Sequence, residues 1–176
     1  MMQKPTNNRG YKVEHTEYIE ASPEVIWETI SMPENLNQCH PFCKKNTMIK
    51  WEKEKSIDLI EYENGLKLKR HFTKWFEGKG YELLIGKSGT ASAQVLWDIE
   101  SKYDQISSLS IQLEIYPEVI LKKHPKIFHF FILNWYVIPK MKDYLQSVIL
   151  GFKQYIESGK KVSKNEFGVN LMFSKP

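Results

Sequence analysis

The sequence is poor in cysteine and arginine. Its two cysteines, Cys39 and Cys43, are too few for a disulfide framework, and without a visible secretory signal we expect reduced thiols in the cytoplasm. Arg9 and Arg70 are the only arginines, and the lysines are scattered, with no run longer than two. The net charge of +4 therefore indicates a solvated basic surface rather than a patch that binds nucleic acid.

Long hydrophobic runs and known catalytic motifs are also missing. The longest apolar run, residues 127–138, is interrupted by His129 and Asn134 and is shorter than the ~20 residues of a spanning helix. We find no nucleophile elbow, phosphate-binding loop or zinc-protease motif. Residues 39–43 contain Cys and His, but a zinc site usually needs four such ligands, and the other histidines are scattered. We expect neither a metal nor a cofactor.

Alternating apolar and polar residues are the main pattern that is present. Within residues 106–116, four apolar residues alternate with four polar ones: Leu109, Ile111, Leu113 and Ile115 against Ser108, Ser110, Gln112 and Glu114. This alternation predicts a strand with one buried and one wet face. Other strand-like segments cover residues 11–19, 45–51, 57–62, 66–76, 81–85 and 91–99. The turns between consecutive segments are short, as at residues 63–65, which predicts an antiparallel meander.

Helix signals stand at both ends of this meander. Ser22 and Pro23 suit the start of a helix over residues 23–31, and a second short helix follows Pro33. A long amphipathic helix is predicted to open at Pro139 and to end near Gly159. The element order predicts an α+β fold in which a curved antiparallel sheet wraps around this helix. We expect one domain over residues 1–176, with a loose tail (1–10), an apolar insertion (117–138) and a C-terminal extension (160–176) that packs back.

The stretch from Tyr18 to Trp27, YIEASPEVIW, resembles the opening of the START-like, birch-pollen-allergen-like superfamily (SRPBCC), which includes polyketide cyclases. The resemblance covers roughly residues 11–160. It implies a helix-grip fold whose apolar cavity, between sheet and last helix, binds and could transport a hydrophobic small molecule or lipid. The loop His40-Pro41-Phe42 resembles cyclase- or dehydratase-like members, so an enzyme using the same cavity is the alternative. A protein-interaction module of the same fold is the third class.

Arg70 is the leading polar candidate for the binding site. It shares the face of Leu68 and Phe72, so an inward orientation would place its charge near the cavity. It could anchor a ligand carboxylate, phosphate or carbonyl, or it could pair with Glu61 or another acid. The sequence does not show whether Glu61, His40 or Asp98 converge on a substrate, so no catalytic residue is assigned.

The remaining candidates are apolar. Phe72, Trp97, Ile111 and Leu113 are candidate cavity walls, although plain core packing explains each of them as well. Gly151 lies on the apolar stripe of the last helix and either leaves room for a ligand or permits close packing. The candidate ligand-binding residues are therefore Phe42, Arg70, Phe72, Trp97, Ile111, Leu113, Tyr144, Val148 and Gly151.

The aromatic run over residues 127–136 has three interpretations: a lid over the cavity, a contact with a membrane interface, or a buried connecting helix. Burial is the favoured one. The expected partners are a hydrophobic small molecule or lipid and, transiently, a membrane surface, but not nucleic acid. The oligomeric state does not follow from the sequence.

Overall fold

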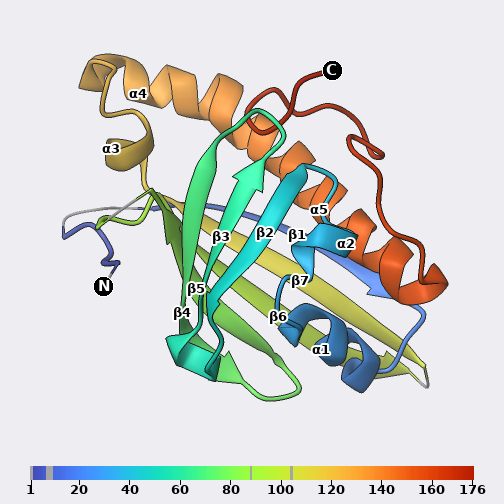
Figure 1. Ribbon diagram of the computed structural model, residues 1–176. Helices are drawn as coiled ribbons and strands as arrows, with labels where there is room; N and C mark the ends of the chain where they lie inside the picture. The colour runs from blue at the N-terminus through green and yellow to red at the C-terminus, as the bar shows by residue number, and fades with distance from the viewer. Residues whose placement is uncertain (1, 7–9, 88, 104) are drawn as a thin grey trace.

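The computed structural model describes residues 2–6, 10–87, 89–103 and 105–176 (Figure 1). Over these residues the chain forms a seven-stranded antiparallel sheet in the order β1-β7-β6-β5-β4-β3-β2. The strands are β1 (Tyr11–Ile19), β2 (Cys43–Lys50), β3 (Ile57–Tyr62), β4 (Lys67–Phe76), β5 (Gly80–Gly86), β6 (Ala93–Tyr103) and β7 (Ile106–Ile115). The meander from β2 to β7 follows the predicted order, and β1 adds to its far edge beside β7.

The helices lie before and after this meander. α1 (Pro23–Ser31) and α2 (Leu36–Cys39) connect β1 to β2, and a 3-10 turn, η1 (Lys53–Lys55), precedes β3. After β7 come α3 (Pro117–Ile120), α4 (Lys126–Ile132), a π-helical turn η2 (Leu133–Val137) and α5 (Ile138–Ser158). α5 crosses the concave side of the bent sheet (Figure 1). The predicted helix-grip arrangement is confirmed.

The segment α5 begins within one residue of the predicted Pro139 and ends at the predicted Gly159, but Pro139 is not the start of the helix as a whole. The helix is continuous from Lys126 through η2 into α5, and Pro139 is one of the first residues after the π turn. A proline inside a helix lacks the N–H for one backbone bond and crowds the preceding turn. The wider π turn directly upstream accommodates that mismatch, so the helix continues through the proline.

The favoured prediction for residues 127–136, a buried connecting helix, is wrong. Ile127, Phe128, Phe130, Phe131 and Trp135 are all exposed, because α4 extends beyond the end of the sheet (Figure 1). Leu133 and Val137, in η2, are buried in the core, and the partly buried Ile132 packs against it. Among the described residues, none of the helices combines the length and apolar character that crossing a membrane requires.

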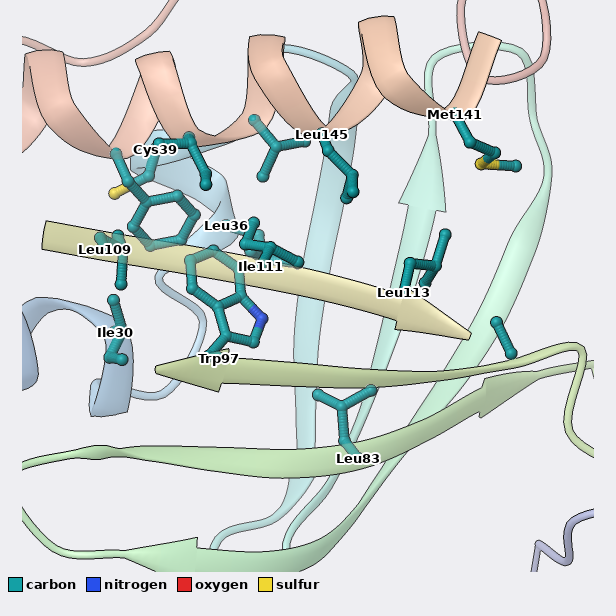
Figure 2. Packing of buried hydrophobic residues seen from close by; sticks show 14 of the residues in the cluster. Ile30, Leu36, Cys39, Leu83, Trp97, Leu109, Ile111, Leu113, Met141 and Leu145 are labelled. Atoms are coloured by element: carbon teal, nitrogen blue, oxygen red, sulfur yellow. The ribbon is translucent and has the colours of Figure 1, made fainter. Parts of the chain in front are cut away.

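The inner faces of β6 and β7 form one wall of the core. Leu109, Ile111 and Leu113 of β7 are buried, as their alternation predicts. Figure 2 shows the β7 side chains and Trp97 of β6 turned toward the helix that carries Met141 and Leu145. At the far end of this layer, the Trp97 and Phe152 rings meet edge to face with centroids 4.8 Å apart.

Both ends of the chain contact the domain. Met2 is buried, and Gln3 pairs with Thr90, so residues 2 and 3 are not part of a loose tail. Residues 7–9 of the expected tail lie outside the described residues. The C-terminal extension returns along α5 and buries Phe173, whose ring centroid lies 4.3 Å from that of Tyr144. The extension thus covers one side of the sheet–helix interface.

Gly151 marks a close contact between α5 and α2. A Cβ atom on Gly151 would lie 2.1 Å from the carbonyl oxygen of Cys39 and 3.2 Å from Cδ of Pro41. Of the two explanations that the sequence left open, close packing therefore accounts for this glycine. The approach is to the backbone of α2 rather than to the sheet.

We expect Gly151→Ala to lower the free energy of unfolding by about 1–3 kcal/mol, because an added methyl group overpacks the contact. Alanine would by itself favour the helix by ~1 kcal/mol, so a net loss isolates the clash. Urea denaturation measures the change, and Gln146→Ala, on the exposed face of the same helix, is the control. A Gly151→Ala protein as stable as the wild type would contradict the close contact.

Candidate functional site

A cavity of about 760 Å³ lies between the sheet and α5. Its walls are mainly apolar and come from both layers: Ile60, Leu83, Val95, Trp97, Ile111 and Leu113 from the sheet, and Met141, Leu145 and Val148 from α5. The lining becomes exposed at one end, where it includes Lys87, Thr90, Lys122 and Lys123. The cavity is therefore apolar inside, and its mouth, between the β5–β6 loop and the α3–α4 loop, carries these three lysines and the exposed Glu118.

Six of the nine candidate binding residues line this cavity: Arg70, Trp97, Ile111, Leu113, Tyr144 and Val148. The other three lie outside the lining. Phe42 is fully buried and stacks on Tyr144 with ring centroids 5.7 Å apart. Phe72 contributes to an aromatic cluster with Trp51 and Tyr81, and Gly151 contacts α2. These three residues support the cavity from behind rather than facing it.

Arg70 forms a buried ion pair with Asp58. The two residues are directly opposite in the β3–β4 register, and both side chains are almost inaccessible. Arg70 Nε donates to Asp58 Oδ1 at 2.7 Å, and Nη2 donates to Oδ2. Burial alone would lower the pKa of Arg70, but the charge and hydrogen bonds of Asp58 raise it above the ordinary value. Arg70 therefore stays charged beside the cavity.

Glu61 is not the partner of Arg70. It lies on β3, where its carboxylate pairs with Lys44 at 3.1 Å and with Lys67 at 3.0 Å. Asp98 lies on β6 outside the cavity lining, so Glu61 and Asp98 do not converge with His40 at the cavity.

Cys39 and Cys43 are free thiols, and among the described residues no cluster of His, Cys, Asp and Glu could hold a metal ion.

A chain of polar groups closes the inner side of the cavity. The Phe42 backbone N–H donates to His40 Nδ1 at 3.1 Å, so the proton of the neutral imidazole lies on Nε2. That N–H donates to the Tyr144 hydroxyl at 3.0 Å, and this hydroxyl lies 3.1 Å from that of Tyr62. The two hydroxyl groups carry two protons, and the hydrogen bond between them uses only one. Whichever tyrosine donates, one proton is left for an acceptor in the cavity.

Burial keeps this chain uncharged. Desolvation, followed by the Arg70 charge, lowers the pKa of His40 to about 3. Desolvation raises the pKa of Tyr144 to about 12 and raises that of Tyr62 well above its ordinary value. At neutral pH the polar side of the cavity therefore offers one hydroxyl donor next to the Arg70–Asp58 ion pair. No sequence pattern indicated Tyr62, and His40 was marked only as a loop residue and as one of three groups that could act on a substrate.

The buried His40 should make stability fall with acidification. Its pKa drops from 6.5 to about 3 on folding, so between these values the unfolded chain takes up a proton that the folded protein does not. The free energy of unfolding should then decrease as the pH falls from 6.5 toward 3, by up to about 1.4 kcal/mol per pH unit. Urea denaturation across this range measures the slope.

His40→Gln should flatten that slope, whereas His124→Gln, an exposed change, should retain it because His40 remains. Equal slopes in the wild type and in His40→Gln would contradict a neutral, buried His40. The comparison uses slopes, because the Gln variant also loses a ring contact with Phe42.

No protein-family model and no curated protein sequence matches the chain. Solved structures do. An aromatase/cyclase from Streptomyces is 10% identical, with a TM-score of 0.64 over 88% of this chain and 100% of that one. A Thalictrum norcoclaurine synthase is 11% identical, with a TM-score of 0.59 over 86% and 97%. Ara h 8.0201 is 13% identical, with a TM-score of 0.57 over 83% and 97%.

The chain therefore has the helix-grip fold of the START-like, birch-pollen-allergen-like proteins, as its entry motif indicated. At these identities the likeness establishes the fold alone. Since one such fold supports different activities, what this protein does must be argued from its own cavity.

Proposed function

We propose that this protein is a single-domain carrier that binds a hydrophobic small molecule or lipid in the cavity beneath α5. The observation that carries the proposal is the combination of a volume of about 760 Å³ with predominantly apolar walls. Sites for small molecules are typically concave and apolar, with a few polar groups that fix orientation, and measure roughly 300–1,000 Å³. Here the polar groups are the Tyr62–Tyr144 hydroxyl pair and Arg70.

The arrangement favours a ligand with one polar end. A carbonyl, hydroxyl or carboxylate oxygen would accept the remaining hydroxyl proton at Tyr62 and Tyr144, within the field of Arg70. The apolar body would then contact Trp97, Leu113 and Val148. Apolar burial contributes roughly 25 cal/mol per Å², so most of the affinity would come from the walls and the orientation from the polar groups.

Two measurements test the proposal. The first is native mass spectrometry of the purified protein. The second is displacement of anilinonaphthalene sulfonate by a panel of fatty acids, sterols and aromatic polyketides. We expect a stoichiometric small molecule or saturable displacement, and a higher melting temperature with the ligand. A protein that carries no such molecule, and that none of the panel stabilises, would count against a carrier.

The cyclase or dehydratase alternative rests on the same polar chain. Acid–base catalysis works best when the pKa of the catalytic group lies near the operating pH. The pKa of His40 is lowered to about 3 and that of Tyr144 is raised to about 12, so neither group exchanges protons readily at neutral pH. This favours binding over catalysis. Turnover of a polyketide substrate that is lost in Tyr62→Phe would reverse the preference.

The protein-interaction alternative predicts a filled interior, and the cavity argues against it.

A cytoplasmic location also belongs to the proposal. Its support is that Cys39 and Cys43 do not form a disulfide with each other. Burial raises the pKa of both thiols to about 12, so they resist oxidation and suit a structural role.

A further inference from the structure

Six large apolar side chains are exposed together at the outer end of the long helix. We call them the α4 face: Ile127, Phe128, Phe130, Phe131, Trp135 and Tyr136. Trp135 is 79% exposed and Ile127 is 76% exposed, and α4 contains no buried residue. The segment projects past the sheet, away from the core that the rest of the helix covers (Figure 1).

Three aromatic members of the α4 face, Phe130, Phe131 and Trp135, are in ring contact. Phe130 and Phe131 meet edge to face with centroids 5.7 Å apart, and Phe131 meets Trp135 in the same way at 5.6 Å. Contiguous exposed apolar patches of this kind usually mark a contact surface, whereas single exposed apolar residues do not.

The charged residues on both sides of the α4 face are mainly basic. Five lysines flank the aromatic run, namely Lys122, Lys123, Lys126, Lys140 and Lys142, and the nearest acids are Glu118 and Asp143. Lys140 pairs with Asp143 at 3.5 Å, and the other four lysines are exposed. Apolar side chains bordered by lysines are complementary to a surface that is apolar beneath and anionic on top.

We propose that the α4 face docks this protein on an anionic membrane surface. The aromatic side chains would enter the boundary between headgroups and acyl chains, where Trp and Tyr are favoured, and the lysines would contact anionic headgroups. Lys122 and Lys123 also line the mouth of the cavity, so docking would bring the mouth to the lipid surface. The docking surface itself does not depend on what the cavity binds.

Co-sedimentation of the full-length protein with vesicles tests this proposal. We expect binding to vesicles of phosphatidylcholine mixed with phosphatidylserine, weaker binding to phosphatidylcholine alone, and loss as salt is raised. The double variant Phe131→Ser with Trp135→Ser should weaken binding by about 100-fold, because each substitution removes an aromatic ring that would be buried in the membrane interface. Replacing Lys122, Lys123 and Lys126 with Gln should weaken it by about tenfold or more and remove the salt dependence.

Two matched variants serve as controls. Tyr18→Ser with Ile49→Ser removes similarly exposed apolar side chains from the sheet. Gln at three exposed lysines elsewhere changes the net charge equally: Lys12, Lys45 and Lys69. Both should bind vesicles within about twofold of the wild type, apart from a weak general effect of net charge.

Three results would overturn the proposal. The first is no binding to anionic vesicles, and the second is equal losses in the α4 variants and their controls. The third is a wild-type dimer, by light scattering, that becomes monomeric in Phe131→Ser with Trp135→Ser, since a second copy would then cover the face. Displacement of anilinonaphthalene sulfonate without vesicles is measured separately, so a failure of docking is distinguishable from a failure of the carrier function.

Discussion

Replacing Asp58 with Ala is expected to lower the free energy of unfolding by about 3–5 kcal/mol, which is a large part of the stability of a typical domain. The change leaves Arg70 buried beside the cavity without its partner. A guanidinium is so basic that Arg70 keeps its proton at neutral pH even without Asp58, so it cannot escape the penalty by becoming neutral. Chemical denaturation with circular dichroism measures the loss.

A matched control stands on the same strand. Glu61→Ala also removes a carboxylate from β3, but its partners Lys44 and Lys67 are exposed, so the loss should be small. Replacing both members of the buried pair, Asp58→Leu with Arg70→Met, should restore most of the stability, because no uncompensated charge remains. If Asp58→Ala and Glu61→Ala were equally mild, the Arg70–Asp58 pair would not be buried as described.

Filling the cavity should abolish most ligand binding while preserving the fold. Leu113→Trp with Val148→Trp places a large ring on each wall, one from β7 and one from α5. If a ligand thereby loses about 100 Å² of apolar contact, its binding weakens by about 2.5 kcal/mol, or roughly 100-fold. Displacement of anilinonaphthalene sulfonate reports the affinity.

The melting temperature separates occlusion from misfolding. The added rings take up empty volume, so the double variant should melt at or above the wild-type temperature. Gln112→Trp with Gln146→Trp adds the same two rings to the opposite face of β7 and the exposed face of α5, and should leave binding unchanged. Unaltered affinity in the cavity variant would place the binding site elsewhere.

The fold could be predicted from the sequence because the patterns that indicate its strands and helices are local. The alternation of Leu109, Ile111 and Leu113 in β7, and the Ser22-Pro23 helix start, each depend on neighbours within a few residues. The Arg70 partner could have been predicted as well. Counting outward from the turn at residues 63–65 places Asp58 opposite Arg70, and the structure has this register.

The remaining features depend on contacts that local patterns do not encode. His40 and Tyr144 are 104 residues apart, and only the crossing of α5 over the sheet brings them together. Pro139 has the local appearance of a helix start, and only the π turn upstream allows the helix to pass through it. The apolar composition of α4 suggested burial, but within the described part of the chain no other element buries any of its residues.

The strand order also sets the sequence of events in folding. Strands β2 to β7 pair with their neighbours in the chain, whereas Tyr11 of β1 pairs with Ile115 of β7. Closing such a long loop costs conformational entropy that local hairpins avoid, so β1 should dock last and slowly. During synthesis on the ribosome, β1 would stay unpaired until β7 had emerged.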